Sequence, residues 1–398
     1  MAADPDATPA VGHDPAVDTV IAALGTPGSV DLVPTPALLC DIDLLARNIE
    51  SMQRTADQAG IALRPHTKSH KSARIARMQL DAGAAGICVA KLSEAEALVD
   101  ELGRRAVSPV DASTVDILVT SPLGGPRTAG RAAALAGRCR LAVVVDHVDG
   151  VAELAAASRG GAEIRVLCDV DVGLGRTGVV GTAAALDIAD RIDAVSTLRF
   201  GGVQGYAGHA QHIQGRDLRR QATDSATDRL VTVIDALEAA GHDVAVRTGG
   251  GTGTALLDIE RGVLNELQPG SYAFMDREYR DALDGDPESG YAQSLSLVTT
   301  VLSTNQTGFV TVDAGLKSMA TDAGEPAVVG RPGSTFAFFG DEQGLVTATP
   351  AWRPSRGERV QLVPPHCDPT VDRHDRIWLT RGDVVVEMVA VTARGCSY

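Results

Sequence analysis

The chain has 398 residues, of which 36 are Lys or Arg and 51 are Asp or Glu, so its formal net charge is −15. Hydrophobic residues make up 44% and charged residues 22%, a balance typical of globular proteins and not of disordered chains. The acidic balance excludes the basic surface that binding to nucleic acid or to an anionic membrane requires. Small-molecule chemistry is therefore the expected class of function.

The N-terminal region carries no targeting signal that we recognise. Residues 1–30 are rich in Ala, Pro, Asp and Gly without periodicity, which predicts a mobile leader. The first residues lack the basic and apolar regions of a signal peptide, and no window approaches the roughly 18 apolar residues of a membrane span. We therefore expect a cytoplasmic protein. The six cysteines form no Cys-x-x-Cys pair, which predicts buried thiols and no disulfide framework.

From residue 62 onward, short β-rich runs alternate with Ala- and Leu-rich helical stretches. Such alternation requires parallel strands joined by right-handed crossovers, and eight units match a (β/α)₈ TIM barrel, which we assign to residues 31–284. A doubly wound open sheet is the alternative. The eight strand runs are Ala62–Lys68, Gly86–Lys91, Asp116–Ser121, Leu141–His147, Glu163–Asp171, Phe200–Tyr206, Val244–Thr248 and Glu266–Tyr272. The clearest helices are expected at Ser93–Leu102, Thr128–Leu135, Asp149–Ser158, Thr182–Ile192 and Asp217–Ala240.

After Asp284 the helical stretches stop and the chain reads as strands and turns. This pattern predicts a second, mostly antiparallel β domain over residues 285–398. The run Ala37–Ile42, within residues 31–45, is expected to pair with that domain before the chain enters the barrel.

The active site of a barrel lies at the carboxyl ends of its strands. The first strand closes with His66 and Lys68, which strand alternation places on one face at the barrel mouth. A lysine at an apolar rim is a candidate Schiff-base amine, because desolvation lowers its pKa. A solvated loop lysine is the alternative, and a metal pair of His66 and His70 would need a helix there.

The seventh strand closes with a turn of four glycines and three threonines, residues 248–254. Backbone N–H groups, hydroxyls and a helix start at this position favour a phosphate group, and the alternative is a turn without a ligand. The string is neither a Walker loop nor an opening GxGxxG, so nucleotides are not favoured.

Two further strand ends carry polar side chains. Arg176 follows the fifth strand in a glycine-rich turn and could bind an anion or a ring nitrogen, or pair with Asp169 or Asp171. The sixth strand ends with Tyr206, His209 and His212, and imidazoles transfer protons readily near neutral pH. Two of these three could be ordinary rim residues.

The string Pro364-Pro365-His366-Cys367-Asp368-Pro369 suggests a metal site in the second domain. Flanking prolines favour extended backbone, which would put His366 and Asp368 on one side and Cys367 on the other. An imidazole and a carboxylate can ligate Mn²⁺, Mg²⁺ or Zn²⁺, with water in the remaining positions. A zinc pair of His366 and Cys367 is the weaker alternative.

The chain from about Pro34 to its C-terminus closely resembles the D-threonine aldolase and D-serine dehydratase family of fold-type III, alanine-racemase-like pyridoxal phosphate enzymes. The strings that carry the resemblance are TPALLCDIDLLARNI, RPHTKSHK, DVGLGRTGV, GVQGYAGHAQH, TGGGTGT, ELQPGSYAFMD, DAGLKSMATD and PPHCDPT.

The resemblance implies a pyridoxal 5′-phosphate cofactor and a role for each matching position. Lys68 would carry the cofactor, Arg176 would face the pyridine nitrogen and Tyr206 would flank the ring. His212 would act as the proton acceptor, and His366 with Asp368 would hold a divalent metal, with Mn²⁺ or Mg²⁺ favoured over Zn²⁺. The cofactor phosphate would lie in the turn formed by Thr248, Gly249, Gly250, Gly251 and Thr252.

Family members differ in reaction, and the metal motif bears on the choice. Dehydratases of the family show His-x-Cys where aldolases show His-x-Asp, so Asp368 favours an aldolase that cleaves β-hydroxy-D-amino acids to glycine and an aldehyde. Ala207 and Gln343 depart from the family pattern, which often has histidine at both positions. A dehydratase is the alternative, and a non-catalytic pyridoxal phosphate homeostasis protein, which typically lacks the β domain, is less favoured. A homodimer is implied by the resemblance.

Overall fold

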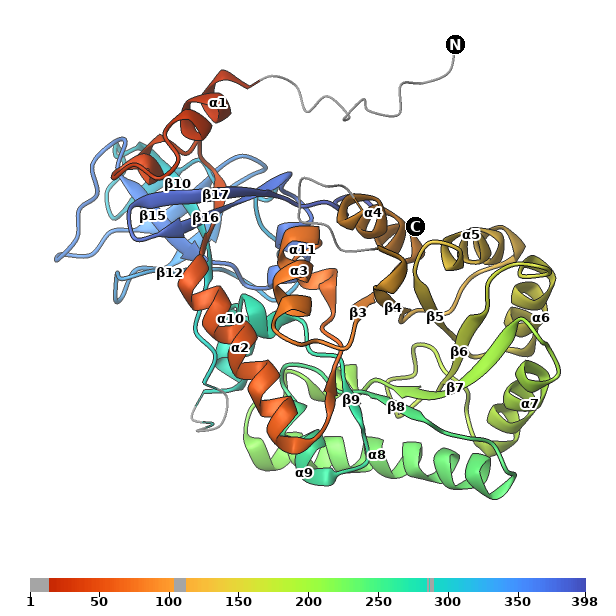
Figure 1. The fold of residues 1–398 in the computed structure, drawn as a ribbon. Coiled ribbons are helices and arrows are strands. Elements are labelled where there is room, and N and C mark those ends of the chain that lie inside the picture. The colour runs from red at the N-terminus through yellow and green to blue at the C-terminus, as the bar shows by residue number, and fades with distance from the viewer. Residues whose placement is uncertain (1–13, 104–111, 285, 287–289) are drawn as a thin grey trace, which may run out of the picture.

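The computed structural model describes residues 14–103, 112–284, 286 and 290–398, which form two β-sheets and the helices around them (Figure 1). The first sheet has eight strands in the order β2-β9-β8-β7-β6-β5-β4-β3, and all its pairings are parallel. The strands are β2 (Ala62–Leu63), β3 (Ile87–Val89), β4 (Asp116–Val119), β5 (Arg140–Val145), β6 (Ile164–Asp169), β7 (Leu198–Gly205), β8 (Val246–Gly249) and β9 (Glu266–Leu267). Each lies within or overlaps one of the eight predicted runs.

Backbone hydrogen bonds between the two edge strands, β2 and β3, and the residues next to them close this sheet into a barrel. The N–H group of Ala85 donates to the Leu63 carbonyl over 2.8 Å, and the N–H group of Cys88 donates to the Pro65 carbonyl over 2.8 Å. His66 and Cys88 form a parallel bridge at the same seam. The predicted TIM barrel is therefore confirmed, and the open-sheet alternative is excluded.

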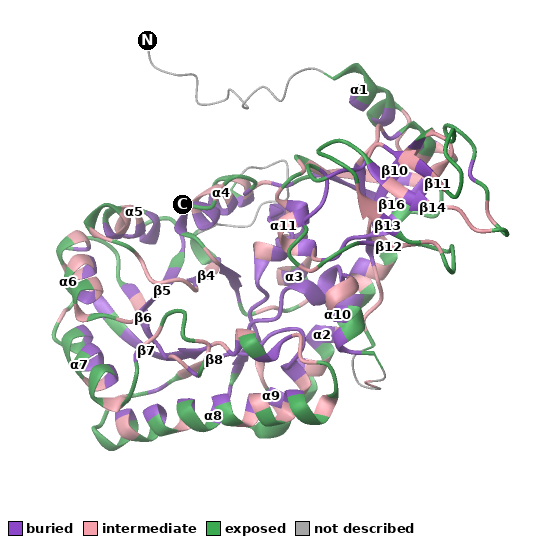
Figure 2. Cartoon of the chain, turned by 180° about the vertical axis from the view of Figure 1, so that it is seen from behind, coloured by how far each residue is buried: buried purple, intermediate pink, exposed green. Residues whose placement is uncertain are grey.

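Helices cover the outside of the barrel, and their apolar faces explain why (Figure 2). In α4 (Leu92–Leu102), the buried side chains Leu92, Ala95, Leu98, Val99 and Leu102 recur at helical spacing and form one face. The five helices expected from periodicity are all present. The helices of the barrel are α2 (Ile42–Ala59), α3 (Ala73–Asp81), α4, α5 (Pro126–Ala136), α6 (Val148–Ala157), α7 (Thr182–Asp193), α8 (Arg216–Ala239), α9 (Ala255–Arg261) and α10 (Arg277–Ala282).

The second sheet is mostly antiparallel, and its main path runs β13-β14-β11-β10-β1-β16-β17, with β15 pairing to β10 and β12. β1 (Ala37–Asp41) lies between β10 and β16 and is parallel to β16, so the chain contributes one strand here before it enters the barrel. The other strands are β10 (Leu295–Ser303), β11 (Phe309–Val312), β12 (Ala327–Val328), β13 (Phe336–Phe338), β14 (Gly344–Thr347), β15 (Arg359–Val363), β16 (Arg376–Arg381) and β17 (Val384–Ala390).

The expectation of a mobile leader needs correction from residue 14 onward, while residues 1–13 lie outside the described part. α1 (Pro15–Ala22) begins at the cap residue Asp14 and buries Val17 and Val20. These valines pack in a small core with Leu39 and Trp378 of the second sheet. The Ala- and Pro-rich composition suggested disorder, but two apolar side chains one helical turn apart are enough to dock this short helix.

The cysteine side chains and the helix lengths can be compared with the sequence analysis. All six cysteines are free thiols and five of them are buried, as the sequence predicts. Over the described ranges, no helix combines the length and the apolar character needed to cross a membrane.

A candidate active site at the mouth of the barrel

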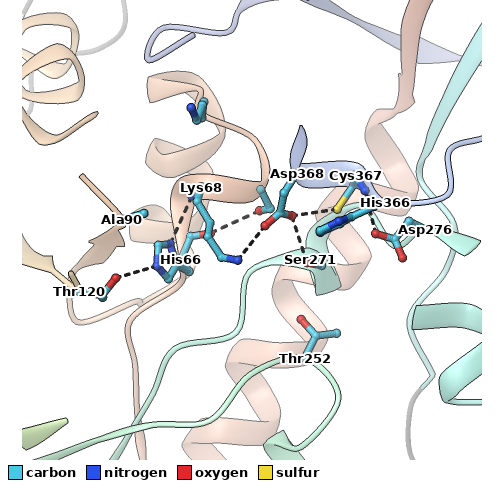
Figure 3. Close-up of polar contacts among 12 residues, drawn as sticks. His66, Lys68, Ala90, Thr120, Thr252, Ser271, Asp276, His366, Cys367 and Asp368 are labelled. Atoms are coloured by element: carbon cyan, nitrogen blue, oxygen red, sulfur yellow. Dashed lines mark hydrogen bonds and ion pairs between the residues drawn. The ribbon is translucent and has the colours of Figure 1, made fainter. Parts of the chain in front are cut away.

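Lys68 lies at the barrel mouth in η2 (Thr67–Ser69), a single 3₁₀ turn that follows β2. Its Nζ atom is 2.9 Å from Oδ2 of Asp368, which comes from the second domain (Figure 3). The Asp368 carboxylate raises the pKa of Lys68, burial acts in the opposite direction, and the nearby Tyr206 phenol adds to the rise. Two residues 300 positions apart in sequence are thus brought into one ion pair.

His66 and His70 flank Lys68 in sequence but have separate partners. Nδ1 of His66 accepts from the Lys68 N–H group over 3.3 Å, and Nε2 is 3.1 Å from Oγ1 of Thr120. His70 is buried and bonds through Nε2 to Gln79 at 3.2 Å, and burial lowers the pKa of its imidazole to about 4. His66 therefore supports the Lys68 turn, and the two rings do not form the alternative metal pair.

The predicted extended backbone is present at His366 but is wrong from Cys367 onward. His366 is the N-cap of a short helix, α11 (Cys367–Val371), and Asp368 lies in its first turn. A proline in the first turn of a helix loses no hydrogen bond, so Pro369 fits here and does not enforce an extended chain. The strand alternation expected for these residues therefore does not apply.

Asp368 nevertheless points toward the barrel mouth, with polar groups around its carboxylate (Figure 3). Oδ1 accepts from Ser271 Oγ over 3.3 Å and from the Cys367 thiol over 3.2 Å. Burial opposes ionisation, but the Lys68 ammonium and His366 outweigh it and hold the pKa of Asp368 below its usual range. Burial also raises the pKa of the Cys367 thiol.

His366 and His212 come together beside this carboxylate. Nδ1 of His366 is 2.7 Å from Oδ2 of Asp322, and the two imidazole rings are 6.4 Å apart between centroids. Burial lowers the pKa of His366, but Asp368 and the Asp322 hydrogen bond act more strongly together, and the net direction is upward. The structure thus gathers Lys68, Asp368, His366 and His212 in one place.

The surroundings of His212 favour a neutral ring. Nδ1 is 3.3 Å from Oε1 of Glu278, and the Tyr279 ring packs edge to face against the imidazole at 4.4 Å. Burial and the neighbouring His366 lower the pKa of His212 to about 4. Nε2 is buried without a hydrogen-bond partner among the described residues. A carboxylate beside Nδ1 favours the tautomer that leaves Nε2 free to accept a proton.

Arg176 and Tyr206 form a second part of the mouth. The guanidinium carbon of Arg176 lies 5.7 Å from the centre of the Tyr206 ring. The two aspartates considered as partners bond elsewhere: Asp169 accepts from Gln204 and Thr177, and Asp171 accepts from the N–H groups of residues 173 and 175. Arg176 is exposed, and so is His209, which makes His209 a rim residue.

The glycine-rich turn after β8 is close-packed, which explains its composition. A Cβ atom on Gly249 would stand 2.1 Å from the Gly205 carbonyl oxygen, and one on Gly251 would stand 2.4 Å from Oε1 of Gln211. Gly250 has φ +70°, a conformation that glycine adopts without strain. Thr248 and Thr252 are buried, and Thr252 Oγ1 accepts from the Tyr272 N–H group over 3.0 Å.

The turn is connected to the catalytic side of the mouth. Ser271, next to Tyr272, bonds to Asp368, and Gln211, next to His212, accepts from the Gly253 N–H group over 3.0 Å. Gln211 also donates to Thr254 Oγ1 and to the Ala207 carbonyl. The turn is therefore rigidly placed relative to both the metal-motif carboxylate and the His212 loop.

Several residues at the mouth escaped the sequence analysis. Thr120, Ser271, Glu278 and Asp322 each contact a predicted site residue, yet each lies far from its partner in the chain, so no local pattern could identify them. Of the two departures from the family pattern, Ala207 is buried beside the Gln211 amide, and Gln343 is exposed in the turn between β13 and β14.

Comparisons with known proteins agree with this architecture. The profile of the alanine racemase N-terminal domain matches residues 40–278, and that of a serine dehydratase domain matches residues 294–380. The chain belongs to the alanine-racemase-like family.

Among individual relatives, the D-threonine aldolase of Arthrobacter sp is 37% identical over 92% of this chain and 94% of its own length. The 3-hydroxy-D-aspartate aldolase of Paracoccus denitrificans strain Pd 1222 is 35% identical over 92% and 93%. The crystal structure of D-threonine aldolase from Filomicrobium marinum superposes with a TM-score of 0.88 at 35% identity, covering 94% of this chain and 99% of that one. D-threo-3-hydroxyaspartate dehydratase from Delftia sp. HT23 is more distant, with a TM-score of 0.77 at 28% identity over 91% and 98%.

Proposed function

We propose that this protein is a lyase that cleaves β-hydroxy-D-amino acids, of the D-threonine and 3-hydroxy-D-aspartate type, to glycine and an aldehyde. The observation that carries the proposal is the 2.9 Å pairing of Lys68 with Asp368, beside His366 and His212. It brings the lysine that we propose carries the cofactor next to the motif that we propose binds the metal, in a chain that is 35–37% identical to two aldolases over most of its length.

The residues at the mouth fit pyridoxal phosphate, the cofactor of the family. Lys68 offers an amine in the 3₁₀ turn that follows a barrel strand, and the close-packed turn of residues 249–252 offers fixed backbone groups for a phosphate. Arg176 lies over the Tyr206 ring, where it would meet the ring nitrogen of the cofactor. A guanidinium stays protonated, so Arg176 would hold that nitrogen without giving it a proton. When bound, the cofactor supplies a sink for the electron pair left on Cα.

His366 and Asp368 fit a divalent metal that keeps water or substrate in its other positions. They offer one imidazole nitrogen and one carboxylate oxygen, and the described residues contain no group of three or more metal-binding side chains. A site with so few protein ligands suits Mn²⁺ or Mg²⁺. Such an ion supplies Lewis acidity for the substrate hydroxyl. Chelation should abolish turnover and leave the visible colour of the cofactor, and full activity after exhaustive metal removal would contradict this assignment.

The side chains around His212 provide the proton transfer. His212 is neutral near pH 7, and its free Nε2 removes the proton of the β-hydroxyl. Glu278 holds the ring through Nδ1, and the edge contact with Tyr279 fixes its plane. As the hydroxyl loses its proton to His212, the bond between Cα and Cβ breaks and Cβ leaves as an aldehyde. Cα then takes up one proton, which balances the one that His212 removed, and glycine is formed.

Two alternative functions differ from the aldolase in what they require of the site. A dehydratase would use the same mouth to expel the hydroxyl group, and the relation to the Delftia enzyme keeps it as the second candidate. The His-x-Asp form of the metal motif, with Asp368 where dehydratases of the family show cysteine, favours the aldolase. A homeostasis protein is disfavoured, because the second sheet is present and brings α11 to Lys68.

Product analysis tests the proposal. The protein, supplied with pyridoxal phosphate and Mn²⁺, should release glycine with acetaldehyde from D-threonine and glycine with glyoxylate from D-3-hydroxyaspartate. The L isomers serve as controls and should react little. Ammonia with a 2-oxo acid, in place of glycine, would establish the dehydratase.

We also propose a homodimer. Phe339 is 65% exposed and Leu316 is 39% exposed, and the Leu316 N–H group donates to the carbonyl next to Phe339 over 3.1 Å. Phe339 directly follows β13 and Leu316 lies in the loop after β11, so the two exposed apolar side chains belong to neighbouring loops of the second domain that a second copy would cover. Sedimentation should give twice the chain mass, and Phe339→Glu should shift the equilibrium toward monomer.

A further inference from the structure

Lys71 is a second buried lysine, three residues after Lys68, that the proposed chemistry does not use. Lys71 as a whole is only 6% exposed. Its backbone has φ +49°, in the left-handed region that residues other than glycine rarely adopt. A strained backbone and a buried charge persist only where the surrounding structure fixes them.

The Lys71 ammonium joins three separate parts of the molecule. Nζ is 2.7 Å from Oδ1 of Asp372, the C-cap of α11. It is 3.3 Å from Oε1 of Glu94 in α4, and 3.2 Å from Oγ of Ser397 near the C-terminus. One side chain therefore ties the metal-motif helix, a barrel helix and the end of the chain together.

The backbone of Lys71 is fixed from both sides. Its N–H group donates to the Thr67 carbonyl over 2.7 Å, which closes the turn that contains Lys68. Its carbonyl accepts from the Ala393 N–H group over 2.9 Å, and the Ala73 N–H group donates to Thr392 Oγ1 over 3.2 Å. These bonds connect the Lys68 turn to the segment that follows β17.

We propose that Lys71 is a positioning residue that fixes α11, and with it His366 and Asp368, against the Lys68 turn. This inference rests on the proposed function for the meaning of those three side chains. α11 has five residues and leaves the second sheet on a loop, so its own hydrogen bonds do not define where it lies relative to the barrel. Lys68 and Ser271 hold the first turn of α11 through Asp368, and the Lys71 to Asp372 ion pair adds a constraint at its other end from the barrel side.

The test compares Lys71→Met with Lys71→Arg, in the full-length protein. Met keeps most of the apolar stem and loses the charge, whereas Arg keeps the charge. Glu94 still accepts from the N–H groups of Ala90 and Lys91, so the Met variant retains a partner for that carboxylate. Lys317→Met is the matched control, because Lys317 is an exposed lysine paired with Glu342 on the second domain.

Two measurements are made on each variant. The first is amide hydrogen exchange across residues 367–372 in the protein without added cofactor or metal. The second is the Mn²⁺ dissociation constant, measured by calorimetry. Loss of a residue that orients metal ligands typically weakens metal binding by 10–100-fold. Lys71→Met should speed exchange in α11 and weaken Mn²⁺ binding by about tenfold or more, Lys71→Arg should restore part of both, and Lys317→Met should change neither.

Unchanged exchange in α11 of the Lys71→Met protein would overturn the proposal. Should that variant fail to fold, Asp372→Ala removes the oxygen atoms that accept from Lys71 Nζ and from the Gly395 N–H group, while Lys71 keeps Glu94, and it carries the same expectation. Combining the two substitutions should add little beyond either one, because both break the same link. A wild-type protein that binds no Mn²⁺ would refute the metal site of the proposed function, while the exchange measurement would still decide the role of Lys71.

Discussion

His212 has the environment of a general base at the scale of a single residue. It is neutral at pH 7, its Nδ1 faces Glu278, and its Nε2 has no partner in the described part of the chain. We expect His212→Asn to lower turnover by roughly 10²-fold or more, the usual contribution of proton transfer to a rate. The absorption spectrum of the bound cofactor should not change, because the His212 imidazole lies beside the metal motif.

The matched control for this substitution is His209→Asn, three residues earlier in the same loop. His209 is exposed at the rim, so its loss should leave turnover within about twofold of the wild type. Equal effects of the two substitutions on steady-state turnover would remove His212 from the chemistry.

Lys68 and Lys71 are only three residues apart in the sequence, but their environments give them different roles. Lys68 faces the mouth and remains 39% exposed at its side chain, whereas the Lys71 side chain is 7% exposed and directed at Asp372 and Glu94. Lys68→Ala should therefore abolish the visible absorption of the bound cofactor. Borohydride reduction followed by peptide mapping should find the cofactor on Lys68, and a label on Lys71 or Lys91 would contradict the assignment.

At the scale of elements, hydrophobic periodicity predicted the strands and helices of the barrel, because local sequence determines them. Each of the eight barrel runs contains or overlaps a strand, because strands buried on both faces form compact β-branched runs between helices. The metal motif was misread because proline is compatible with both an extended segment and the first turn of a helix, and only tertiary context distinguishes them.

Asp258 in α9 gives an element-scale prediction about pH. It lies under the glycine-rich turn, accepts from Thr254 Oγ1 over 2.7 Å, and burial raises its pKa to about 7. A carboxyl group whose pKa is raised in the folded state stabilises the fold while it is protonated, and this stability is lost as the pH rises from the unfolded value of about 4 through 7.

Asp258→Asn should therefore stabilise the protein at pH 8 by on the order of 2 kcal/mol and have little effect at pH 4. The asparagine oxygen can still accept from Thr254, so the geometry is preserved. Urea unfolding of both proteins at the two pH values measures the difference, with the exposed Asp235→Asn on α8 as control. A variant that is less stable than the wild type at pH 8 would show that the ionised carboxylate is needed.

At the scale of the whole molecule, the site exists because two sheets meet. The barrel contributes Lys68 and His212, and the second domain contributes His366 and Asp368 on α11. The sequence identified all four residues singly, but the Lys68 to Asp368 contact depends on β1, the C-terminal segment and Lys71, which position the domains through contacts between distant residues. Such long-range contacts leave no periodic pattern in a single sequence. The residues of the site could therefore be predicted, but their arrangement in space could not.

The N-terminal helix provides the last test, because it separates whole-molecule stability from the chemistry of the mouth. Val20 is fully buried in α1 and packs with Trp378 and Val298 on the face of the second sheet, whereas the adjacent Ile21 is 41% exposed. Val20→Ala removes about two buried methylene equivalents, so the free energy of unfolding should fall by about 1–2 kcal/mol and the melting temperature by a few degrees. Ile21→Ala, on the same helix with the same gain in helix propensity, should have a much smaller effect. Turnover should be unchanged in both variants, since none of the mouth residues contacts this small core. If Val20→Ala melted with the wild type in a thermal scan, α1 would not be docked in solution, and residues 14–30 would be the mobile leader that their composition suggests.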